Sequence, residues 1–122
     1  MDFENQIKGL YKKADQLDVK GFLSYLTPNF RFQFGNAPEI QGKEAVQKGL
    51  SELFSKLSGM QHHFIHLWPV QLNTIILEAK VTYTTREGRQ MTFPSMSLIE
   101  RETGTNLIQR MQVFTNIDSL FS

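Results

Sequence analysis

The stretch TIILEAKVTYTT, residues 74–85, decides the fold. Apolar and polar side chains alternate along it, which is the period of a β-strand with two different faces. The apolar set is Ile75, Leu77, Ala79, Val81 and Tyr83. The alternation distinguishes two faces but does not say which one is inside. A strand of this length must twist, so the sheet that contains it is expected to curve.

Three further segments read as extended: residues 61–72, 90–101 and 106–118. The connections 86–89 and 102–105 are short and polar and each contains a glycine, which suits β-hairpins. The last three segments are therefore predicted to form an antiparallel meander. Pro94 lies inside one of them. Because proline cannot donate a ladder hydrogen bond, we expect a bulge or a sheet edge there.

The first half of the chain has a helical period. An apolar stripe runs from Phe3 to Leu17, and Asp18 suits the N-cap of a short second helix that ends before Pro28. A strand is predicted over 29–34. A third helix begins at Gly42–Lys43 and runs through residue 57, with Gly59 just beyond its end as a C-cap.

Helices followed by long antiparallel strands predict an α+β fold, with three N-terminal helices packed on a curved, mostly antiparallel sheet. The 122 residues are expected to form a single domain, 1–122. A curved sheet closed by helices encloses a cavity of the kind that binds small molecules.

Composition excludes several classes of protein. The chain has no cysteine, which rules out disulfide frameworks, thiolate nucleophiles and cysteine-ligated metal sites. A formal charge of +1 argues against nucleic-acid binding. No apolar run approaches the length of a membrane span, and the N-terminus lacks the basic start of a signal peptide. We expect a cytoplasmic protein with no membrane or nucleic-acid partner. Ten phenylalanines suggest a generous core, an aromatic cavity or an apolar interface.

The order of elements resembles the nuclear-transport-factor-2-like (NTF2-like) superfamily, in its SnoaL-like branch. The resemblance rests on five segments spread over nearly the whole chain, residues 17–23, 26–30, 42–46, 81–89 and 110–116. It implies a cone-shaped fold. Members include ketosteroid isomerases, polyketide cyclases, epoxide hydrolases and dehydratases, as well as non-catalytic binding or dimerisation modules, so the fold does not fix the activity.

The resemblance also aligns catalytic positions, and this chain departs from them. Phe34 stands where the isomerases have a carboxylate base, and Met96 where they have a neutral acid. Asn116 stands where cyclases carry an aspartate, and an amide cannot shuttle a proton. Tyr11 lies near the isomerases' helix-1 tyrosine. The Asp-Arg-Asp arrangement of the epoxide hydrolases cannot be assembled.

We therefore expect a small-molecule-binding SnoaL-like protein without a complete catalytic set and without a cofactor. The alternative is an isomerase, cyclase or dehydratase that acts on a small hydrophobic oxygenated substrate by acid/base chemistry. Glu78 or a histidine such as His63 would then be the base. A third interpretation is a pure interaction module.

The family pattern turns the even-numbered sheet positions toward the cavity, and it implies a partly polar, aromatic-lined pocket. The residues expected there are Tyr11, Phe34, Trp68, Glu78, Met96, Arg110, Gln112, Phe114 and Asn116. The competing interpretation makes the even positions a solvated face and the odd ones the core. If the odd face is instead convex, a second subunit should cover it, so we expect a homodimer through the sheet face.

His62, His63 and His66 form a cluster. His62 and His66 would share a strand face, as a metal site requires, but no further ligand lies nearby and we expect no bound metal. The competing interpretations are partly buried histidines in a strand, or one histidine serving as acid or base. The latter needs an orienting partner that the sequence does not reveal.

Overall fold

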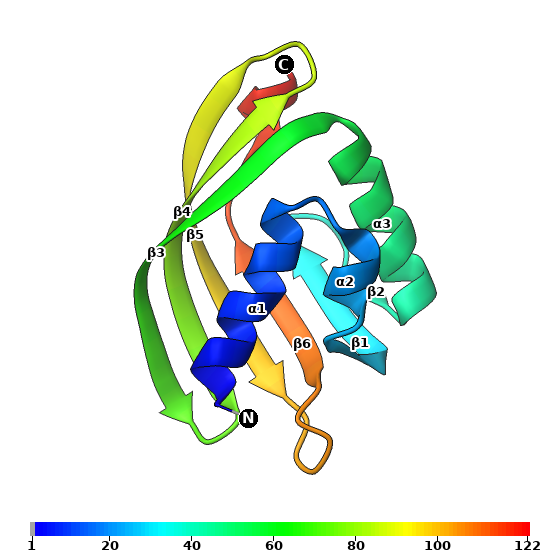
Figure 1. The fold of residues 1–122 in the computed structure, drawn as a ribbon, viewed down its shortest axis with the longest axis vertical. Helices are drawn as coiled ribbons and strands as arrows, with labels where there is room; N and C mark the ends of the chain where they lie inside the picture. The colour runs from blue at the N-terminus through cyan, green and yellow to red at the C-terminus, as the bar shows by residue number, and fades with distance from the viewer. Residues whose placement is uncertain (1) are drawn as a thin grey trace.

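The computed structural model describes residues 2–122, in which three α-helices pack against one curved six-stranded sheet (Figure 1). The elements are α1 (Phe3–Asp15), α2 (Val19–Leu23), β1 (Leu26–Phe34), β2 (Ile40–Gln41), α3 (Lys43–Ser55), β3 (Leu57–Gln71), β4 (Thr74–Thr85), β5 (Gln90–Arg101), β6 (Ile108–Phe114) and the 3-10 helix η1 (Asp118–Phe121). The strand order is β2-β1-β6-β5-β4-β3, and only β1 and β6 are parallel. The predicted α+β fold is confirmed.

The meander of β4, β5 and β6 is confirmed, and β4 and β5 have the predicted bounds. Pro94 pairs with Lys80 without a register shift, so there is no bulge. Pairing between β5 and β6 begins only at Met96, which leaves the first half of β5 as an edge. The Pro94 carbonyl faces that edge, where it accepts the Thr115 hydroxyl at 2.8 Å. The missing N–H therefore costs no ladder bond.

The predicted element ends were less accurate. Asp18 caps α2 as expected, accepting the Gly21 N–H at 2.8 Å. However, α2 ends at Leu23 and β1 already begins at Leu26. Helix α3 ends at Ser55, so Gly59 lies inside β3 and is not a helix cap. The two-residue strand β2 was not predicted, because it is too short to show a period.

The odd-numbered face of β4 is the concave, buried face. Leu77, Ala79, Val81 and Tyr83 are at most 3% exposed and pack beneath the helices, with α1 lying across this face (Figure 1). The even positions form the convex face. The prediction that the even positions face the cavity is wrong, because burying the apolar set gains hydrophobic free energy whereas burying Glu78 and Lys80 would cost it.

A bulge in β3 separates the histidines. Phe64 pairs with Ala79 and His66 with Glu78, so Ile65 is an extra residue between them. His62 therefore lies on the concave side while His66 lies on the convex side. The expectation that His62 and His66 share a face is wrong, since an inserted residue reverses the alternation.

No helix within residues 2–122 is both long enough and apolar enough to cross a membrane.

Candidate functional site

A cavity of about 560 Å³ lies between the helices and the concave face of the sheet. Its buried wall is mostly aromatic and aliphatic and includes Phe22, Leu50, Phe54, Val81, Met111 and Val113. Exposed lining residues from the loop after β1 and from the C-terminal segment mark its mouth. They are Asn36, Ala37, Pro38, Asn116, Asp118 and Phe121, and the one other exposed lining residue among residues 2–122 is Gly49 of α3.

Gly35 shapes this mouth. Its N–H donates to the Val113 carbonyl at 2.8 Å, which extends the parallel pairing of β1 with β6 by one bond. The backbone then turns away with a φ of 56°, a conformation that glycine adopts without strain. A Cβ atom at this position would lie 2.9 Å from the Thr115 carbonyl oxygen.

An Asp–His pair lies beside the cavity. Asp15, the last residue of α1, approaches His62 of β3, with 2.6 Å between Oδ1 and Nδ1. The same carboxylate accepts the backbone N–H of His62 at 3.1 Å. Two bonds to one residue fix the imidazole, which is 11% exposed and lines the cavity. Among residues 2–122, no group hydrogen-bonds its Nε2, which is therefore the ring nitrogen open to a ligand.

Tyr11 stands next to this pair. Its ring centroid is 4.5 Å from that of His62, and it meets Phe64 edge-on at 5.6 Å. The Tyr11 hydroxyl is buried and makes no well-formed hydrogen bond within the described chain. Burial raises the pKa of Tyr11 to about 12, and the Asp15 charge adds to the rise while the nearby Ser97 hydroxyl offsets part of it. A buried donor without a partner favours a ligand that supplies an acceptor.

Three further polar side chains line the cavity from the sheet: Tyr83 of β4, and Ser95 and Ser97 of β5. All three are at most 8% exposed. Burial is also the main reason that the pKa of Tyr83 is raised, with smaller contributions from Tyr11 and Asp15. Buried hydroxyls and one imidazole thus line the wall of a mostly apolar cavity.

The structure places only three of the nine sequence-predicted pocket residues at this cavity. Tyr11 and Phe34 line its wall, and Asn116 lies at its exposed mouth. The Asn116 side-chain oxygen accepts the Asp118 N–H at 2.9 Å, which forms a local turn just before η1.

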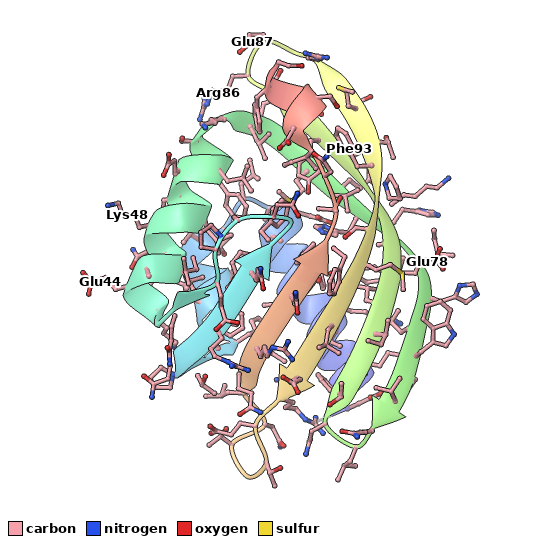
Figure 2. All side chains as sticks on the ribbon, turned by 180° about the vertical axis from the view of Figure 1, so that it is seen from behind. Glu44, Lys48, Glu78, Arg86, Glu87 and Phe93 are labelled. Atoms are coloured by element: carbon pink, nitrogen blue, oxygen red, sulfur yellow. The ribbon has the colours of Figure 1, made fainter. Side chains whose placement is uncertain are left out.

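The other six lie on the convex face, away from the cavity. Glu78 accepts from His66 at 3.1 Å and points outward in Figure 2. Arg110 pairs with Glu100 at 3.0 Å and also donates to Gln112 at 3.0 Å. The remaining three are Trp68, Met96 and Phe114, which are 42%, 39% and 56% exposed. All six side chains lie on the convex face of the sheet, so the prediction that they line the cavity is wrong.

The two candidate bases, His63 and Glu78, also lie away from the cavity. His63 is exposed and pairs with Lys80 on the convex face, and Glu78 shares that face. The residues that do gather include His62, which the sequence indicated only as one of three candidate histidines. The sequence did not identify its partner Asp15 or the hydroxyl residues Tyr83, Ser95 and Ser97. Asp15 and His62 are 47 positions apart, and only the packing of α1 on β3 joins them. Within the described chain, no group of three His, Cys, Asp or Glu side chains could hold a metal ion.

The curved sheet with its enclosed cavity defines a class of protein, the NTF2-like fold. The sequence profile of the SnoaL-like domain family matches residues 7–110, so this chain belongs to that family. No curated protein sequence matches it significantly.

Solved structures agree on the fold. An NTF2-like protein of unknown function from Burkholderia pseudomallei is 13% identical, with a TM-score of 0.84 over 99% of this chain and 96% of that one. TerC, co-crystallised with polyporic acid, is 15% identical, with a TM-score of 0.80 over 98% and 95%. SalBIII, an epoxide hydrolase/cyclase-like enzyme, is 13% identical, with a TM-score of 0.82 over 94% and 91%.

Proposed function

We propose that this protein binds a small, largely apolar molecule that carries an oxygen acceptor. The observation that carries the proposal is the buried hydroxyl of Tyr11, which makes no well-formed hydrogen bond within residues 2–122 and lies in the wall of a mostly apolar cavity of about 560 Å³. That volume is in the range of ordinary ligand sites. An acceptor on the ligand would satisfy the hydroxyl, which otherwise stays desolvated at a cost. Membership of the SnoaL-like family and the co-crystallisation of the similarly folded TerC with polyporic acid support a small-molecule ligand.

Binding can be tested with N-phenyl-1-naphthylamine, a neutral aromatic probe whose fluorescence rises in apolar sites. The wild-type protein should bind it with saturation. Ser95→Phe places a large side chain in the cavity and should abolish that binding, while circular dichroism and thermal melts show a folded protein. Unchanged binding by Ser95→Phe would mean that the probe sits elsewhere and would overturn the proposal.

A second candidate function, acid/base catalysis, is favoured by the Asp15–His62 pair. When Nδ1 donates its proton to Asp15, Nε2 carries the lone pair of a general base. The carboxylate also stabilises the imidazolium that forms after proton abstraction. The reaction class is then an isomerisation, cyclisation or dehydration of the bound molecule, with Tyr11 donating to the oxygen that gains charge.

This function can be tested without the natural substrate by using 5-nitrobenzisoxazole. A base removes its carbon-bound proton, the electron pair forms a nitrile, and the N–O bond breaks to give a phenolate. His62→Gln should lower the rate at least about tenfold, because a positioned base typically contributes two orders of magnitude or more. Asp15→Asn should lower it less, and His63→Gln on the convex face should leave it unchanged. Equal rates for the wild type and His62→Gln would exclude His62 as the base.

We also propose that the chain forms a homodimer through the convex face of the sheet. The β-ladder places Met96 beside Phe114 and Trp68 beside Ile76, which itself neighbours Leu98. Nothing among residues 2–122 fully covers this apolar patch, in which Trp68, Met96 and Phe114 are exposed, and a second copy of the same patch would bury it. A Met96→Glu/Phe114→Glu variant should elute as a monomer with the mass of one chain. The wild type and the control Lys48→Glu should elute at twice that mass, whereas a monomeric wild type would refute the dimer.

A further inference from the structure

A second, polar pocket of about 320 Å³ adjoins the cavity. It lies where α3, the turn after β4 and the C-terminal segment meet. Its lining comprises Lys56, Thr85, Arg86, Glu87, Arg89, Leu120, Phe121 and Ser122. Phe121 lines both this pocket and the apolar cavity, so one side chain forms part of both walls. A molecule lying against Phe121 can therefore contact both spaces.

The positive charge of this basic pocket is only partly compensated. Lys56, Arg86 and Arg89 face a single acidic side chain, Glu87. Within residues 2–122, no side-chain carboxylate comes within ion-pairing distance of any of the three cations. Three cations against one lining carboxylate leave this concave site with a net positive charge, which attracts an anionic group from outside.

Both guanidinium groups are held in place but only partly used. Arg86 donates through Nε to the Ser55 carbonyl, and Arg89 donates through Nη1 to the Ser122 carbonyl at 2.8 Å. Their remaining N–H groups have no partner within the described chain. A guanidinium fixed at one nitrogen and free at the others can bind an oxyanion with little loss of side-chain entropy.

The turn that carries these arginines is ordered by its own hydrogen bonds. The Thr85 N–H donates to the Arg89 carbonyl at 2.8 Å, and the Arg89 N–H donates back to the Thr85 hydroxyl at 3.1 Å. The Arg86 N–H reaches the Lys56 carbonyl at 3.3 Å, which ties the turn to the end of α3. Figure 2 shows Arg86 and Glu87 at this end of the molecule, beside the short C-terminal helix. Hydrogen bonds within the turn and to the end of α3 therefore fix the backbone that carries Arg86 and Arg89.

Phe121 forms the boundary between the two spaces. Its ring is 45% exposed, and Lys56 Nζ lies 5.3 Å from its centroid. The Lys56 ammonium group thus lies near the ring that lines both spaces, and Arg86 and Arg89 line the basic pocket with it.

We infer that the basic pocket binds the anionic end of a molecule whose apolar body occupies the cavity. This inference rests on the proposed function and narrows its ligand class to amphiphilic anions, such as an aromatic carboxylate, sulfonate or phosphate ester. Apolar burial would then hold one end of the ligand and charge-assisted hydrogen bonds the other.

A matched pair of probes tests this inference. 8-Anilinonaphthalene-1-sulfonate has the same aromatic body as N-phenyl-1-naphthylamine plus one sulfonate. Wild-type protein should bind the sulfonate probe at least about tenfold more tightly at low ionic strength, since the charge-assisted hydrogen bonds to the sulfonate add to the affinity of the shared aromatic body. That preference should shrink in high salt. Arg86→Gln/Arg89→Gln should lose it while binding the neutral probe like the wild type.

Lys48→Gln is the matched control. It removes an exposed cation from the outer side of α3, away from the pocket (Figure 2), and should bind both probes as the wild type does. Inorganic phosphate, added alone as a competitor, should weaken binding of the sulfonate probe without displacing the neutral one. Equal affinity of wild type for the two probes, or a preference that survives in the double arginine variant, would overturn the inference. Failure of wild type to bind either probe would overturn the proposed function as well.

Discussion

At the scale of single residues, the Tyr11 hydroxyl is the most informative group. It is buried without a well-formed hydrogen bond, so its removal forfeits little. Tyr11→Phe should leave the free energy of unfolding unchanged or raise it by up to about 1 kcal/mol, because an unsatisfied buried donor is removed. Asp18→Ala, which deletes the cap of α2, should instead cost about 1 kcal/mol. Urea denaturation would measure both variants, and a Tyr11→Phe variant as unstable as Asp18→Ala would show that the hydroxyl is already satisfied.

The raised pKa of Tyr11 predicts how stability changes in alkali. In the unfolded chain Tyr11 ionises near pH 10, whereas in the folded protein its pKa is about 12. Between these values only the unfolded state releases the proton, so the stability that is fully present below pH 10 is lost as the pH rises through 12. The loss from this one group approaches about 3 kcal/mol, at roughly 1.4 kcal/mol per pKa unit. Tyr11→Phe should therefore lose less stability than the wild type over this interval in denaturation curves recorded at successive pH values. Curves that fall in parallel would contradict the burial of the hydroxyl.

At the scale of elements, Gly35 and Gly49 make opposite predictions for the same substitution. Gly35→Ala puts a Cβ on a residue with a φ of 56° and within 2.9 Å of the Thr115 carbonyl, so it should cost on the order of 1–2 kcal/mol. Gly49 lies within α3, where an added Cβ would meet only the Ile40 side chain at 3.5 Å. Gly49→Ala should therefore stabilise the helix by roughly 0.5–1 kcal/mol. Thermal melts would compare the two, and equal shifts of Tm would count against the described backbone at Gly35.

The helices and strands were predictable from the sequence wherever a regular pattern of apolar and polar residues continues over many positions. Residues 74–85 form a strand with the predicted bounds, since apolar and polar residues alternate over twelve positions. Residues 90–101 also have the predicted bounds, because short glycine-containing connections flank them. The bulge at Ile65 was not predictable. Nothing in the sequence around His62 and His66 signals an inserted residue, because it is specified by the partner strand β4. That single residue decides that His62 faces the cavity and His66 does not.

At the scale of the whole molecule, the sequence indicated the α+β layers but not the inner face of the sheet. The alternation distinguishes Glu78 from Leu77 without saying which of the two lies inside. The family pattern led to the wrong choice, because it turned the even-numbered positions toward the cavity. The burial of the apolar side chains of β4 beneath α1 shows that the odd-numbered face is the inner one. The Asp15–His62 pair also depends on tertiary packing, since the two residues meet only after α1 has packed on β3. Sites made by long-range packing are those that local patterns cannot reveal.

The convex face that this arrangement leaves uncovered leads to a last prediction, for which Trp68 is the reporter. Trp68 is the only tryptophan of the chain, is 42% exposed, and stacks on His66 at 4.8 Å on that face. If a second copy covers the patch, dilution should expose the indole by mass action. The emission maximum of the wild type should then move to longer wavelengths on dilution. Phe114→Glu should show the long-wavelength maximum at every concentration, because a carboxylate facing an apolar partner surface would be desolvated without a counter-charge. Emission of the wild type that is independent of concentration and equal to that of Phe114→Glu would mean that the patch stays open to water.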